Sequence, residues 1–130
     1  MKGEIYMNEL PINKQTISIN VYISQPMGGH TLEEILEVRN NVIDFIKKLM
    51  PNTELIFIDN VSINKDYIGN SMSHPGLWYF AESIKLMSEA DIIVFANGWE
   101  NSVGCRLEHD IANAFNIKML DIKILGGLIK

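Results

Sequence analysis

The chain has 130 residues, and 47% of them are hydrophobic, which suits one domain with its own core. Its formal net charge of −5 argues against binding of a nucleic acid polymer, because such proteins present a basic surface. No apolar run approaches the roughly 18 residues of a membrane helix, and residues 1–15 lack the apolar core of a signal peptide. The single cysteine, Cys105, excludes an intramolecular disulfide and predicts a cytoplasmic location.

The first half of the chain predicts a strand, a helix and a second strand. Residues 16–23 alternate apolar and polar side chains, as a strand does, and residues 24–30 are rich in turn formers. Thr31 begins a helix as its N-cap, because a glutamate follows at the spacing of a capping box. That helix ends at Pro51, and residues 54–58 form the next strand.

The second half continues the alternation after a long polar loop. Residues 59–76 are predicted to be this loop, which exceeds the usual connection of about 4–6 residues and suits a binding loop or lid. Residues 77–88 are predicted as a helix, 91–96 as a buried strand, 104–115 as a helix and 117–120 as a short strand. The apolar tail beyond them is too short to assign.

Alternating strands and helices predict a parallel sheet with helices on both faces. The two loops with the most unusual composition, 24–30 and 97–104, each follow a strand. In a doubly wound sheet such loops flank the point where the strand order reverses, and ligands bind there. We therefore expect these loops to lie together at the carboxyl edge of the sheet.

The segment 98–108 is the most informative part of the chain. It runs from a buried strand into a helix, so Glu108 is expected in the first or second turn of that helix. A carboxylate at this edge, near free backbone N–H groups and the small hydroxyl residue Ser102, suits chemistry on a sugar-bearing or phosphate-bearing ligand. The alternative interpretation is structural, because the helix dipole favours an acid near a helix start and serine is a common N-cap.

Three segments together resemble the nucleoside 2-deoxyribosyltransferase superfamily. They are the run Tyr-Ile-Ser-Gln-Pro-Met-Gly-Gly-His at 22–30, the strand start at 90–94, and Ser-Val-Gly-Cys-Arg-Leu-Glu at 102–108 followed by Ala112. The form Gly-Trp-Glu-Asn-Ser-x-Gly-x-x-x-Glu resembles a small branch that is common in bacterial and phage genomes. The resemblance extends over about residues 17–120.

This resemblance implies a flavodoxin-like, three-layer α/β/α domain with four or five parallel strands. Residues 1–130 would form a single domain, with 1–15 as an N-terminal extension. It implies cleavage of the N-glycosidic bond, or deoxyribosyl transfer, on a nucleoside or its 5′-monophosphate. Glu108 takes the position of the nucleophile and Ser102 that of a phosphate-binding serine. It also implies no cofactor and a homodimer or larger homo-oligomer, for which the apolar tail would suit an interface.

One position departs from the family pattern. The monophosphate hydrolases carry an aspartate where this chain has Ser83, with Glu82 beside it. Neighbouring helix residues point about 100° apart, so Glu82 is not an automatic replacement. A second acid is expected because protonation helps a base to leave. Glu82 is our candidate, with Asp59 and Glu100 as alternatives.

Glycine has no side chain, so Gly28 and Gly29 allow the backbone to approach a ligand closely. An aromatic ring can stack on a base, and Trp99, Trp78 or Tyr79 could do this, although tryptophans more often pack inside the protein. Asp91 is expected to have only a structural role. The predicted substrate-binding residues are Ser24, Gln25, Met27, Gly28, Gly29, Asp59, Trp99, Asn101, Ser102 and Gly104.

Two function classes remain open from the sequence. Intact Glu108 favours an enzyme acting on a nucleotide or nucleoside, and Ser83 favours a protein that only binds or senses one. Three scattered histidines and Cys105 give no metal-ligand spacing, so no metal site is predicted. Cys105 lies near a helix start, which predicts a lowered thiol pKa, but a cysteine nucleophile is disfavoured because His109, four residues on, is the one identifiable partner histidine.

Overall fold

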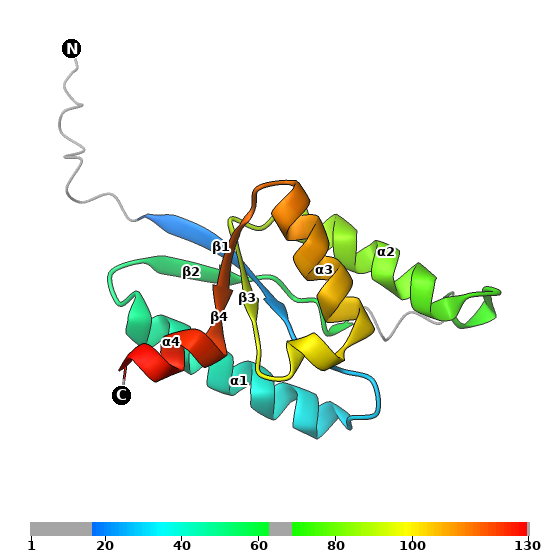
Figure 1. Ribbon diagram of the computed structural model, residues 1–130, viewed down its shortest axis with the longest axis horizontal. Helices are drawn as coiled ribbons and strands as arrows, with labels where there is room; N and C mark the ends of the chain where they lie inside the picture. The colour runs from blue at the N-terminus through cyan, green and yellow to red at the C-terminus, as the bar shows by residue number, and fades with distance from the viewer. Residues whose placement is uncertain (1–16, 63–68, 130) are drawn as a thin grey trace, which may run out of the picture.

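The chain folds around a four-stranded sheet in which every strand pair is parallel (Figure 1). The computed structural model describes residues 17–62 and 69–129. The strand order is β2-β1-β3-β4. The strands are β1 (Ser18–Ser24), β2 (Glu54–Phe57), β3 (Ile92–Phe95) and β4 (Lys118–Asp121).

Helices cover both faces of this sheet, which gives the predicted flavodoxin-like three-layer α/β/α fold (Figure 1). One face carries α1 and α4, and the other carries α2 and α3. These helices are α1 (Leu32–Leu49), α2 (Pro75–Met87), α3 (Val103–Ala114) and α4 (Ile122–Ile129). The order reverses between β1 and β3, so the crevice expected for ligands opens at their carboxyl ends.

The alternation of side chains in β1 builds the two cores and also directs polar groups to one side. Val21 and Ile23 pack with residues of α1, whereas Tyr22 packs on the opposite face among residues of α2 and α3. Successive strand residues point to opposite faces, so Ser24 shares the face of Tyr22. Both residues are almost fully buried, at 1% exposure each. β1 therefore brings two hydroxyl groups beneath α3.

The helix boundaries follow local sequence signals. Thr31 and Glu34 form the predicted capping box at the start of α1. α2 begins at Pro75, two residues before the predicted start, because proline suits the first helical position. The tail forms α4, which the sequence left unassigned since Gly126 and Gly127 interrupt its apolar pattern.

The long loop after β2 is described only in part. Gly69–Ser71 forms a short helical turn within it, while residues 63–68 lie outside the described part of the chain. The predicted N-terminal extension, 1–15, also lies outside it. None of the helices in the described ranges combines the length and apolar character needed to cross a membrane.

Candidate active site

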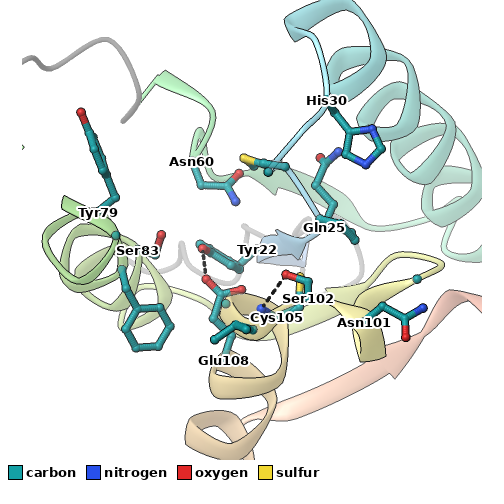
Figure 2. A pocket seen from close by; sticks show the side chains of 18 of the residues that line it. Tyr22, Gln25, His30, Asn60, Tyr79, Ser83, Asn101, Ser102, Cys105 and Glu108 are labelled. Carbon is teal, nitrogen blue, oxygen red and sulfur yellow. Dashed lines mark hydrogen bonds between the residues drawn. The ribbon is translucent and has the colours of Figure 1, made fainter. Parts of the chain in front are cut away.

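A pocket of about 740 Å³ lies at the carboxyl ends of β1 and β3. The loops after these strands line one side of it and α2 lines the other (Figure 2). A Cβ added to Gly98 would lie 3.8 Å from Cγ of Pro26, so the two loops approach closely, which confirms their predicted convergence. The volume is in the range of about 300–1,000 Å³ typical of small-molecule sites.

Glu108 lies in the second turn of α3 and lines this pocket, although its side chain is largely buried. Both carboxylate oxygens accept hydrogen bonds from β1: Tyr22 Oη donates to Oε2 at 2.8 Å, and Ser24 Oγ donates to Oε1 at 2.6 Å. Burial raises the pKa of Glu108, and the bonds from Ser24 and Tyr22 limit the rise. Each oxygen keeps one further lone pair, so the fixed carboxylate can still act on a ligand.

Tyr22 is the centre of the hydrogen bonds around Glu108. Burial and the adjacent Glu108 carboxylate raise the pKa of Tyr22, so its hydroxyl stays protonated and donates. The side chains of Ser83 and Asn60 also hydrogen-bond to Tyr22. Figure 2 shows Ser83 on α2 and Asn60 after β2 on either side of this hydroxyl. Three elements therefore hold the tyrosine that orients Glu108.

Arg39, on the buried face of α1, fixes Asn60 in turn. Its guanidinium donates to Oδ1 of Asn60 at 3.0 Å and to the carbonyl of Ile58 at 2.9 Å. Asn60 donates from Nδ2 to the carbonyl of Ile23 at 2.9 Å, which settles the orientation of its amide. Burial lowers the pKa of Arg39, and the charge of nearby Asp59 opposes this. Arg39 thus ties α1 to the loop that presents Asn60 to the pocket.

The start of α3 offers hydrogen-bond donors to the same pocket. Ser102 is the N-cap of α3, as its hydroxyl accepts from the amide of Cys105 at 3.3 Å. Val103 and Gly104, the first two helical residues, also line the pocket, and first-turn N–H groups have no partner within their own helix. An anion at this helix start would meet those N–H groups and the Ser102 hydroxyl.

Cys105 does not have the lowered pKa predicted from its place near the helix start. It is 3% exposed, and this burial raises the pKa of its thiol, which outweighs the opposing effect of the neighbouring Ser102 and Ser24 side chains. Desolvation penalises a thiolate more than the helix start favours it. The prediction of a lowered pKa is therefore wrong, and Cys105 is not an activated nucleophile.

The loops bring most of the predicted binding residues to the pocket. Gln25 donates from Nε2 to the carbonyl of Ile35 at 3.0 Å, which leaves its Oε1 buried without a partner in the described part of the chain. Ser24 contributes through its bond to Glu108. The predicted residues that line the pocket are Gln25, Met27, Gly28, Asn101, Ser102, Gly104 and Glu108.

Four other predicted site residues are not among those that line the pocket: Glu82, Asp59, Trp99 and Gly29. Glu82, our candidate acid, pairs with Lys85 at 2.9 Å, and Ser83 lines the pocket instead, because neighbouring helix residues point about 100° apart. Asp59 accepts the hydroxyl of Ser62 at 2.6 Å and two backbone N–H groups, which lower its pKa. Glu82 and Asp59 therefore contact neighbouring residues of their own segments and do not line the described pocket.

The tryptophans pack rather than line the pocket. Trp99 stacks on His109 with ring centroids 4.5 Å apart, and its indole donates to Asp121 at 3.0 Å. Trp78 meets Tyr79 edge to face, and only Tyr79 lines the pocket. Asp91 has the expected structural role, as its carboxylate accepts a hydrogen bond of 2.8 Å from the backbone N–H of Asn20. Glu100, the third candidate acid, is likewise not part of the pocket lining.

Sequence reasoning missed Tyr22, Asn60 and Arg39 as parts of the site. Signals for two of them were present. Tyr22 lies two residues before Ser24 in a strand, so both point to one face. Arg39 follows Ile35 by four residues and precedes Val42 by three, which places a charge on the apolar face of a helix. A buried arginine needs polar partners, and here they are parts of the site.

The pocket carries little positive charge. Among the described residues, no lysine or arginine lines it, and His30 is its sole histidine. No group of three or more His, Cys, Asp or Glu side chains in residues 17–62 and 69–129 is arranged to hold a metal ion. The site therefore offers one carboxylate, several hydroxyl and amide groups and a helix start.

The comparisons with known proteins identify a family but no activity. No curated protein and no solved structure matches this chain. The model of a family described as a domain of unknown function, DUF4406, matches residues 19–121, which include β1 except its first residue, β2 to β4 and every described residue of the pocket. The chain therefore belongs to the DUF4406 family.

Proposed function

We propose that this protein cleaves the N-glycosidic bond of a nucleoside 5′-monophosphate, with Glu108 as the nucleophile. The observation that carries the proposal is the carboxylate of Glu108, buried beside a 740 Å³ pocket and held on both oxygens by hydroxyl groups. The proposal includes membership of the nucleoside 2-deoxyribosyltransferase superfamily, which the sequence resembles. It also includes a cytoplasmic location and a homo-oligomeric assembly.

The chemistry of the bond explains why such a carboxylate suits this reaction. Departure of the base leaves positive character on C1′ of the sugar. A carboxylate fixed against that carbon can form a glycosyl ester, which water then hydrolyses. Tyr22 and Ser24 hold the Glu108 carboxylate in one orientation, so little reorganisation is needed when the bond breaks.

The start of α3 supports the assignment of a monophosphate. Ser102 and the N–H groups of Val103 and Gly104 lie at a helix N-terminus that lines the same pocket as Glu108. Backbone donors of this kind hold phosphate without a cationic side chain, in keeping with the lack of lysine and arginine among the described lining residues. A phosphate bound at the start of α3 would set the distance between the sugar and Glu108.

The test is release of free base, followed by chromatography, from a panel of ribo- and deoxyribonucleoside 5′-monophosphates. The proposal expects release by the wild type, none above background by Glu108→Gln, and near wild-type release by the matched control Glu82→Gln. Glu82 lies on the neighbouring helix and is not part of the described pocket. Release that survives in Glu108→Gln contradicts the proposal.

A second function is favoured by one observation. Ser83 lies where the wall of the pocket faces Tyr22, so α2 presents a hydroxyl there and no carboxylic acid. A protein that only binds or senses a nucleotide would need no acid to release the base. Tight binding of a monophosphate with no release of base from any member of the panel would favour this function.

A further inference from the structure

The charges of the pocket bear on how a nucleobase could leave it. Among the described lining residues, Glu108 is the one carboxylate, and none is a lysine or an arginine. His30 has a half-exposed side chain, and its Nδ1 lies 3.4 Å from Glu34 on the first turn of α1. The formal charge of the described lining is therefore negative, and it is concentrated on Glu108.

The wall opposite the two loops is aromatic and uncharged. α2 presents Tyr79, Phe80 and Ser83 to the pocket, and Figure 2 shows Tyr79 and Ser83 on this helix. The hydroxyl of Ser83 is engaged with Tyr22, while Glu82 is turned toward Lys85. Aromatic rings attract cations through their negative faces. This wall therefore suits a flat, positively charged ring better than an anion.

The two kinds of N-glycoside place different demands on such a site. A neutral base that leaves C1′ takes the bonding electron pair and becomes an anion, so it usually needs a proton from an acid. A base that already carries a positive charge on its ring leaves as a neutral molecule and needs no proton. Glu108 cannot attack as a carboxylate and donate a proton at the same time.

We propose that the substrate of this site is an N-glycoside whose base is already cationic, of the pyridinium or N-alkylated purinium class. The inference rests on the proposed function and specifies the substrate of that same site. Glu108 forms a bond to C1′, and the C1′–N electron pair moves onto the ring nitrogen and neutralises it. Water then cleaves the glycosyl ester, and the sugar phosphate, the neutral base and one proton are released.

The experiment compares substrates that differ in the charge of the base. One pair is 7-methylguanosine 5′-monophosphate and guanosine 5′-monophosphate, and the other is nicotinamide mononucleotide and its reduced form, whose dihydropyridine ring is uncharged. Release of base by the wild type is measured for each, after subtraction of spontaneous hydrolysis. We expect kcat/KM to be at least about 100-fold higher for the cationic member of each pair, because about 10²–10⁴-fold is what a general acid contributes. Glu108→Gln should lose both activities, and Glu82→Gln should keep them.

Each result bears differently on this inference and on the proposed function. Equal kcat/KM within each pair overturns the inference but leaves the proposed function standing, because the protein must then supply a proton. No release of base from either pair or from the wider panel overturns both. Release from the cationic members alone supports both.

Discussion

Arg39→Met is expected to destabilise the protein strongly, since Arg39 is a buried donor with two buried acceptors. The substitution leaves Oδ1 of Asn60 and the carbonyl of Ile58 without the bonds of 3.0 and 2.9 Å that Arg39 supplies. A buried acceptor left unpaired costs about 1–3 kcal/mol, so the two together should cost about 2–6 kcal/mol. That is a large part of the roughly 5–15 kcal/mol that stabilises a domain.

The assay is urea denaturation followed by tryptophan fluorescence. Arg106→Met is the matched control, because Arg106 also donates to a backbone carbonyl, that of Glu100 at 2.9 Å, but on the exposed surface. Water replaces that bond, so a change within about 0.5 kcal/mol is expected. Equal losses for the two variants would show that burial of Arg39 is not what gives its bonds their value, and would refute the reasoning.

Three further predictions concern the site itself. Ser102→Ala should weaken binding of a nucleoside 5′-monophosphate by about 1–3 kcal/mol, measured by calorimetry, and leave the unphosphorylated nucleoside unaffected; equal losses would contradict a phosphate at α3. Burial raises the pKa of Glu108, so the wild type should lose stability relative to Glu108→Gln as the pH rises above about 4, the ordinary pKa of a glutamate, and a constant difference would contradict this. Burial also raises the pKa of Cys105, so its thiol should react with a disulfide reagent much more slowly in the folded protein than in urea.

The fold was predictable because each element carries a local signal. The alternation in β1 and the capping box at Thr31 depend on neighbouring residues alone, and they define a strand and a helix start. The right-handed connection of parallel strands then leaves few arrangements. Alternation also placed the loops after β1 and β3 at one edge of the sheet. α4 escaped prediction because the apolar tail is short and two glycines interrupt its helical pattern.

The partners of Glu108 could not be predicted in the same way. Its position beside the crevice follows from the spacing of the segment 98–108, but the bonds from Tyr22 and Ser24 join residues 86 and 84 positions apart. Nor does sequence show which of two adjacent helix residues faces a pocket. Ser83 does so and Glu82 does not, and that choice depends on how α2 packs. Long-range packing therefore decided the parts of the site that sequence left open.

Trapping of the glycosyl ester on Glu108 tests the central claim most directly. A 2′-fluoro analogue of the best 5′-monophosphate substrate slows hydrolysis of such an ester, so the intermediate accumulates and mass spectrometry of protease fragments can locate it. The account predicts that the fragment with Glu108 gains the mass of the fluorinated sugar phosphate in the wild type and in Glu82→Gln. Release of base with no modified Glu108, or with the sugar attached to another residue, would contradict it.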